Sequence, residues 1–167
     1  MPPADPTDRG APAPEPAALE PVDGLFAARV RDSFARQGLM ATLGAELAEI
    51  SPGFCEIRLP FRDAVSQQHG FFHAGATGAI ADSAGGYAAY SLMGPGDTVL
   101  SVDYKLNLLA PARGELLIAR GRVLRAGATL TVCRVDVFAV RGGEETLCAA
   151  MQQSCIRTPT RAGRAAG

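Results

Sequence analysis

Signatures of several common protein classes are missing from this sequence. The formal net charge of its 167 residues is only −1 and the arginines are scattered rather than striped, which argues against nucleic-acid binding. The first residues have neither the basic start nor the apolar segment of a secretory signal. No run of about 18 apolar residues free of charge exists, so a membrane-spanning helix is not expected. We expect a cytoplasmic protein with no membrane partner.

Motifs of several enzyme classes are also missing. The four cysteines form no C-x-x-C pair, and we interpret them as small buried hydrophobic residues. No G-x-S-x-G segment and no convincing phosphate- or dinucleotide-binding glycine loop is present. His69 and His73 stand four residues apart, but Gly70 and two phenylalanines between them indicate a loop, and no third metal ligand is evident. We therefore expect no metal and no cofactor.

Composition divides the chain into one domain and two tails. Residues 1–22 are rich in proline and alanine and cannot bury enough apolar surface to order themselves. Residues 158–167 have a similar character. The sequence therefore predicts a disordered leader over 1–22, a single domain over 23–157 and a disordered tail over 158–167.

Hydrophobic periodicity predicts the elements of this domain. A helix is expected over 25–37, ended by Gly38, followed by strands over 41–50 and 54–60 with a turn at 51–53. A long helix is expected over 74–91, and four strands over 98–108, 115–125, 128–140 and 146–157. Short connections between successive strands favour an antiparallel sheet. The predicted class is α+β, with the long helix on one face of the sheet and one extra N-terminal helix.

Two of these elements have an informative side-chain pattern. The long helix contains Gly78, Gly85 and Gly86, each of which costs about 1 kcal/mol relative to alanine, a cost that a sheet wrapped tightly around the helix would explain. The strand over 98–108 alternates. Its apolar residues are Leu100, Val102, Tyr104, Leu106 and Leu108, and the opposite face would carry Ser101, Asp103, Lys105 and Asn107.

Polar chemistry is concentrated at two places on the long helix. Asp82 has no lysine or arginine three or four residues away, and an unpaired carboxylate on an apolar helix is costly to bury. Either catalysis or pairing with a distant residue would explain it. At the helix N-terminus, the amides of Ala74 and Gly75 are candidates for an oxyanion hole, since unpaired N–H groups there favour negative charge. An ordinary helix start is the alternative.

These residues resemble a known family. His73-Ala74-Gly75, with Asp82 nine residues after the histidine and Gln67 six before it, is similar to the His-Gly-Gly turn and its partners in hotdog-fold acyl-CoA thioesterases of the phenylacetic-acid-degradation (PaaI-like) type. Residues 104–115 resemble that family's strand ending in a Pro-Ala-x-Gly turn. The resemblance covers about residues 25–157 and implies a hotdog fold. Ala74 replaces the usual middle glycine.

The resemblance implies hydrolysis of acyl-CoA thioesters to a free acid and CoA. Asp82 would be the base or the nucleophile, and the sequence does not choose between them. Gln67 would position the attacking water or bond the substrate carbonyl. His73 would orient that carbonyl or hold the turn.

Substrate contacts and assembly follow from the same residues. Tyr87 and Tyr90, with Gly86, are expected to line an apolar acyl groove. The candidates for the CoA end are Lys105, Asn107 and Arg113, although charges on a solvated face are the alternative.

Asp82 lies about 12 Å along the helix from Ala74, so both can act on one carbonyl only if they come from different protomers. We expect a homodimer, and beyond it a dimer of dimers.

Two other functions stay open. A hydratase or dehydratase on the same fold would need a His/Asp or His/Glu pair at a different spacing, and conversion of an enoyl-CoA or hydroxyacyl-CoA would reveal it. A non-catalytic acyl-CoA-binding module is the second, and Ala74 in place of glycine favours it. Stabilisation by ligand without turnover would identify such a module.

Overall fold

The computed structural model describes residues 19–159. Its helices are α1 (Phe26–Ala35), α2 (Gly38–Leu43) and α3 (Ala74–Tyr90), with a 3-10 turn η1 (Asp63–Val65) before α3. Its strands are β1 (Glu46–Ser51), β2 (Phe54–Pro60), β3 (Asp97–Leu108), β4 (Leu116–Ala126), β5 (Leu130–Arg141) and β6 (Glu144–Pro159). The two strands before the long helix and the four after it confirm the predicted order.

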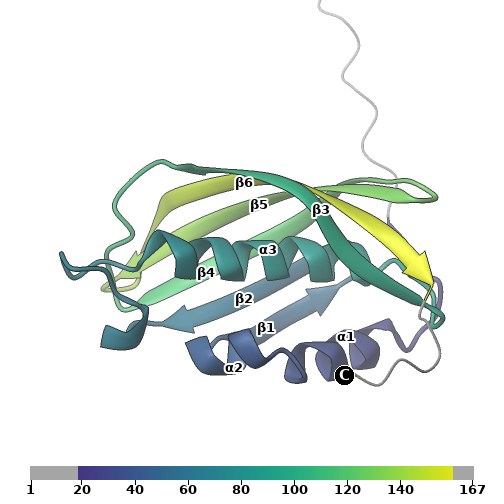
Figure 1. Ribbon diagram of the computed structural model, residues 1–167, viewed down its shortest axis with the longest axis horizontal. Helices are drawn as coiled ribbons and strands as arrows, with labels where there is room; N and C mark the ends of the chain where they lie inside the picture. Colours follow the sequence, from purple (N-terminus) through teal and green to yellow (C-terminus); the bar gives the residue numbers. More distant parts are fainter. Residues whose placement is uncertain (1–18, 160–167) are drawn as a thin grey trace, which may run out of the picture.

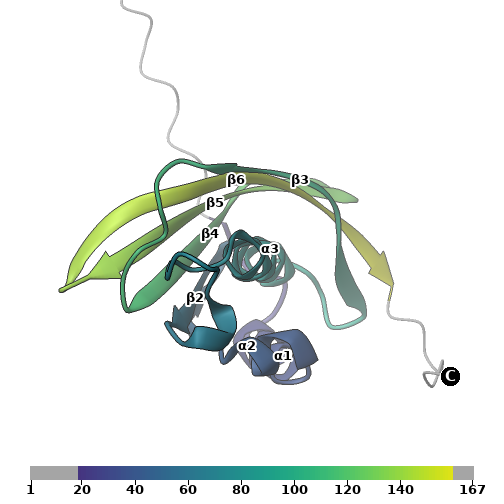
Figure 2. The same cartoon turned by 60° about the vertical axis from the view of Figure 1, so that its left-hand side comes forward.

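The six strands form one antiparallel sheet in the order β1-β2-β4-β5-β6-β3. In Figures 1 and 2 the sheet curves over α3, and α1 and α2 lie against the other side of that helix. This is the sheet wrapped around a long central helix that the resemblance implied, so the α+β class and the hotdog fold are confirmed. β1 and β3 are the two edges of the sheet.

The contact between α3 and the sheet is close because the residues at their interface are small. A side chain at Gly121 of β4 would overlap the carbonyl group of Ala84, and one at Gly85 would overlap Gln153. The expected reason for glycine inside the helix is therefore confirmed at Gly85. The fully buried side chains of this interface are Ile57, Leu59, Ile80, Ala81, Ala84, Ala88, Leu117, Ala119, Val135 and Val137.

The prediction for the N-terminal segment is partly wrong. Gly38 does not end the helical region but begins the second helix α2, and the strand expected from residue 41 begins at Glu46. Gln37 has an extended backbone (ψ 102°), which separates the two helices. Gly44 then ends α2 in the left-handed conformation (φ 71°) that glycine adopts without strain. The structure thus has two N-terminal helices in place of one.

The alternation predicted for β3 is wrong in its first half. The pairing of β3 with β6 shifts between Ser101 and Asp103, so Val102 is the extra residue of a β-bulge. Before the bulge Ser101 faces α3, and after it Leu106 does. The bulge therefore places Ser101 on the inner face of the sheet, opposite to Lys105 and Asn107, with which the predicted alternation had grouped it.

Ordered structure is described at both ends of the predicted domain. β6 continues to Pro159, so Thr158 and Pro159 of the expected tail belong to the sheet. At the other end, the side chain of Leu19 lies against the β1–β2 turn at Gly53. The remainder of the two predicted tails, 1–18 and 160–167, falls outside the described residues.

Candidate active site

The N-terminus of α3 is capped by His73. Its Nδ1 accepts a hydrogen bond from the Gly75 amide at 2.8 Å, so the ring proton of a neutral imidazole is on Nε2. Of the two predicted oxyanion donors, Gly75 is thus occupied by this cap. The Ala74 amide has no acceptor within residues 19–159, and Ala74 is exposed.

The loop before α3 closes on itself through Gln67. The Gln67 amide donates to the Phe71 carbonyl at 2.8 Å and the Gly70 amide donates back to the Gln67 carbonyl at 3.0 Å, with Gly70 at φ 76°. The side-chain oxygen of Gln67 accepts from the His69 amide. Its side-chain NH₂ is therefore the group that Gln67 can offer to a substrate oxygen or to water.

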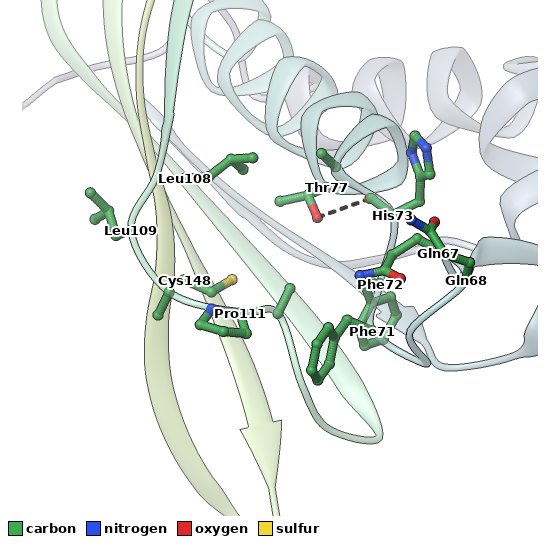
Figure 3. Close-up of a pocket in the computed structure, with 13 residues that line it drawn as sticks. Gln67, Gln68, Phe71, Phe72, His73, Thr77, Leu108, Leu109, Pro111 and Cys148 are labelled. Carbon is green, nitrogen blue, oxygen red and sulfur yellow. Dashed lines mark hydrogen bonds between the residues drawn. The ribbon is translucent and has the colours of Figure 1, made fainter.

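A cavity of about 580 Å³ lies at this end of α3. Figure 3 shows the loop carrying Leu109 and Pro111 on one side of it and the loop carrying Gln67 and Phe71 on the other. Cys148 lies on its wall and donates to the Val137 carbonyl at 3.3 Å. Burial raises the pKa of Cys148 to about 11, so this thiol is protonated at neutral pH and is not a nucleophile.

Asp82 lies in the middle of α3 and is held by residues of the sheet. The Ser101 hydroxyl of β3 donates to Asp82 Oδ1 at 2.6 Å, and Gln153 Nε2 of β6 lies 2.6 Å from the same oxygen. Gln153 Nε2 also donates to Ser101 Oγ at 2.8 Å, which closes a triangle of hydrogen bonds. Within the described part of the chain Asp82 Oδ2 has no partner, so half of the carboxylate is free.

Sequence reasoning missed two members of this triangle. Ser101 was grouped on one face with Asp103, Lys105 and Asn107, because the bulge at Val102 leaves no signal in the hydrophobic pattern. Gln153 was not singled out, because one glutamine in a strand has no motif. The available signal was Gly85, three residues after Asp82, which leaves room for a side chain from the sheet.

A smaller cavity of about 130 Å³ opens beside Asp82. Its wall includes the predicted substrate-binding residues Gly86, Tyr87 and Tyr90. An apolar groove was expected here, but the wall consists largely of hydroxyl and amide groups. Besides Asp82 and the two tyrosines, its polar residues are Ser33, Gln37, Ser83, Thr98 and Ser101.

Two polar contacts cross this small cavity between the N-terminal helices and α3. The Tyr87 hydroxyl lies 3.3 Å from Ser33 Oγ, and the Ser83 hydroxyl donates to Gln37 Oε1 at 3.2 Å. Burial raises the pKa of Tyr87 against a smaller opposing effect of the bond with Ser33, so the phenol stays protonated. The cavity therefore presents neutral hydrogen-bonding groups next to one carboxylate.

The predicted CoA-binding residues are not gathered around Asp82. Leu106 faces α3, so its neighbours Lys105 and Asn107 point to the outer face of the sheet, where Lys105 Nζ donates to Asn107 Oδ1 at 2.9 Å. Arg113 is exposed in the loop after β3. Within one chain, these three residues do not line either cavity beside α3.

The predicted catalytic residues fall into two groups at different points along α3. Gln67, His73, Ala74 and Gly75 lie at its N-terminus, and Asp82 lies about 12 Å further along the helix axis. Each group has its own cavity. Among residues 19–159 no cluster of metal-ligating side chains is present.

Comparison with known proteins identifies similar sequences and structures among thioesterases and esterases. A profile of the thioesterase superfamily matches residues 69–146. A thioesterase family protein from Silicibacter pomeroyi is 46% identical, with a TM-score of 0.79 and coverage of 80% of this chain and 98% of that chain. A relative from Halobacterium salinarum with a provisional esterase name is 31% identical over 105 residues, which are 60% of this chain and 69% of the relative.

One further solved structure supports the fold alone. The E. coli PaaI protein from the phenylacetic acid degradation operon has a TM-score of 0.71 at 18% identity and covers 80% of this chain and 93% of that chain. The fold and these comparisons define the class of the protein as a hotdog-fold thioesterase. The chain belongs to the thioesterase superfamily, and we assign it as a thioester hydrolase.

Within residues 19–159, no helix has both the length and the apolar character needed to cross a membrane.

Proposed function

We propose that this protein hydrolyses acyl-CoA thioesters to a free acid and CoA, with Asp82 as its catalytic carboxylate. The observation that carries the proposal is the state of that carboxylate. One oxygen is fixed by Ser101 and Gln153, and the other has no partner among residues 19–159 and lies beside a cavity. A carboxylate with no cationic partner and one free oxygen is suited to receive a proton from water or to attack a carbonyl carbon.

The second half of the chemistry is supplied by the N-terminus of α3. As water adds to the thioester carbon and its proton passes to Asp82 Oδ2, negative charge develops on the carbonyl oxygen. The free amide of Ala74, at the positive end of the helix dipole, stabilises that charge. The C–S bond then breaks, and CoA leaves as a thiolate that takes up a proton. A thiolate is a good leaving group, so no strong general acid is needed.

The two halves meet in a symmetric dimer. Because Asp82 and Ala74 of one chain are about 12 Å apart along α3, the complete site combines Asp82 of one protomer with the helix N-terminus of the other. β3 supports this assembly, since it is an edge strand with large exposed apolar residues. Leu100, Val102 and Leu108 are 56%, 59% and 60% exposed. An unpaired apolar edge of this kind calls for a partner.

The experiment measures free-thiol release from a panel of CoA thioesters: acetyl, short, medium and long aliphatic, phenylacetyl and hydroxybenzoyl. Asp82→Asn is expected to lower kcat by roughly 10²–10⁴-fold, the range for lost general-base help, with an unchanged circular dichroism spectrum. Asp103→Asn is the matched control, because Asp103 lies on the outer face of β3 and its loss should leave turnover intact.

Two outcomes would overturn the proposal. Turnover by Asp82→Asn close to that of the wild type would remove Asp82 from the mechanism. Silence of the wild type across the panel, together with thermal stabilisation by an acyl-CoA, would instead identify a binding module.

A further inference from the structure

Gln153 of β6 is a fully buried amide that the proposed chemistry does not use directly. Its relative exposure is 0%, although glutamine is usually a surface residue. Its Nε2 lies 2.6 Å from Asp82 Oδ1, 3.1 Å from the Asp82 carbonyl oxygen and 2.8 Å from Ser101 Oγ. All of its polar contacts are thus made to Asp82 or to the hydroxyl that holds Asp82.

The chemistry of these contacts fixes which end of the amide faces Asp82. The opposite orientation would bring the carbonyl oxygen of Gln153 against the carboxylate oxygen at 2.6 Å, and two acceptors repel each other at that distance. The orientation present leaves Gln153 Oε1 buried with no hydrogen-bond partner among the described residues. A buried acceptor left unsatisfied in a native protein calls for an explanation such as a catalytic role for the group.

Gly85 provides the space that this side chain needs. An added Cβ at Gly85 would overlap Gln153 Oε1, so any other residue at position 85 would displace the amide. The oxygen faces the Cα–H of Gly85, which is a weak partner at most. The absence of a side chain at Gly85 therefore leaves the space that the buried side chain of Gln153 occupies.

Gln153 also determines what Ser101 does. A serine hydroxyl can rotate and can donate or accept. Because Gln153 Nε2 donates to Ser101 Oγ, the hydroxyl hydrogen of Ser101 is left to point at Asp82 Oδ1. Two donors converging on Oδ1 hold the carboxylate in one orientation, with Oδ2 directed away from the sheet.

We propose that Gln153 is a positioning residue for Asp82, which it holds with Oδ1 bound to the sheet and Oδ2 presented to the substrate, and that Gly85 is the residue that admits it. The inference rests on the proposed function. It assigns Gln153 no contact with substrate. Its contribution is to the geometry of attack, where small misplacements have large effects on rate.

The test replaces Gln153 by methionine, which has a similar length and no donor. Gln152→Met is the matched control, because Gln152 is the preceding residue of β6 and faces the outer surface. We expect Gln153→Met to lower kcat on the order of 10- to 100-fold with KM changed by less than about twofold. Gln152→Met should keep the wild-type kcat. A Gln153→Met enzyme with full kcat would overturn the proposal.

A double-mutant cycle separates positioning from general damage to the fold. In an Asp82→Asn background, Gln153→Met should cause almost no further loss, because the group that it positions is already disabled. A purely structural role would lower kcat by the same factor in both backgrounds, and that result would refute the inference. Where Gln153→Met does not fold, Gly85→Ala is the second variant, because its methyl group displaces the Gln153 amide, and a loss of kcat is expected there too.

Failure of the proposed function can be told apart from failure of this inference. If the wild type releases no thiol from any thioester, the function is wrong, and crystal structures of wild type and Gln153→Met decide the positioning role. We expect Asp82 in one rotamer on Ser101 in the wild type and displaced in the variant. An unmoved Asp82 in the variant would overturn the positioning role even if the wild type is an active thioesterase.

Discussion

At the scale of single residues, the proposed stabilisation of negative charge depends on the amide of Ala74. Its neighbour Gly75 has already given its N–H to His73 Nδ1. Ala74 is the first residue of α3, the position where a backbone amide has no acceptor inside the helix. The alanine that replaces the usual glycine therefore keeps the N–H group that the proposed mechanism uses.

Ala74→Pro removes this single N–H. Proline is well tolerated at the first position of a helix, and the preceding residue His73 already has the extended backbone that proline requires (φ −68°, ψ 139°). We expect a fall in kcat of about 10²–10³-fold, the range for loss of one oxyanion donor. Thiol-release kinetics measure it, and thermal unfolding checks that the fold is retained. Undiminished turnover would show that the Ala74 amide takes no part.

At the scale of elements, glycine allows α3 and the sheet to pack closely against each other. The two closest approaches are at Gly85 of the helix and Gly121 of β4. Gly78 lies on the same helix, but an added Cβ there would make only an ordinary contact with Leu106 at 3.5 Å. The three positions therefore respond differently to the same substitution.

Gly85→Ala should destabilise the protein, whereas Gly78→Ala should not. At Gly85 the methyl group would overlap Gln153 and crowd Val135, and such overpacking typically costs about 1–3 kcal/mol. At Gly78 the helix propensity of alanine should stabilise by up to about 1 kcal/mol. Urea denaturation followed by circular dichroism measures both. Equal free energies of unfolding for the two variants would contradict the packing seen here.

The sequence predicted best the bounds of those elements whose ends are marked by turn-forming residues. α3 was expected over 74–91 and spans Ala74–Tyr90, because the segment after Tyr90 is closed by Gly94 and Pro95. β2 was expected over 54–60 and occupies those residues, because Pro52 and Gly53 fix the turn before it. The conformational preferences of proline and glycine act over a few neighbouring residues, so a single sequence is enough to predict these turns.

What sequence reasoning could not supply depends on contacts between distant segments. Helix α2 is six residues long and lies over the side of α3 turned away from the sheet, so its stability comes from packing rather than from its own residues. Gln153 is 71 residues from Asp82 in the chain, and only the sheet order brings them together. The bulge at Val102 is visible only in the pairing with β6.

At the scale of the whole molecule, each chain carries two incomplete halves of the proposed site. One half has the free amide and Gln67, and the other has Asp82. An isolated chain cannot bring them together, because they are fixed on one straight helix about 12 Å apart. Catalysis by this arrangement therefore depends on assembly.

Complementation between two disabled variants tests that dependence. Asp82→Asn and Ala74→Pro proteins, each nearly inactive, are unfolded together and refolded so that mixed dimers form. A mixed dimer has one intact site and one doubly defective site, so random pairing should restore about a quarter of wild-type activity. Thiol release after mixing is the measurement.

The control pairs Asp82→Asn with Gln153→Met. Both substitutions affect the same half of the site, so no mixed dimer has an intact combination and refolding together should restore nothing. Absence of recovery in the first mixture would place the complete site within one chain, and recovery in the control would show that Asp82 and Gln153 do not act in the same half of the site.

The bulge at Val102 has a consequence for how β3 can change. Side chains of a strand alternate with a period of two, so one extra residue reverses the phase of everything beyond it. The part before Val102 gives Ser101 to Asp82, and the part after it gives Leu106 to the interior and Lys105 to the surface. Removal of one residue would exchange inside and outside for half of the strand. β3 can therefore accept new side chains far more readily than a change of length.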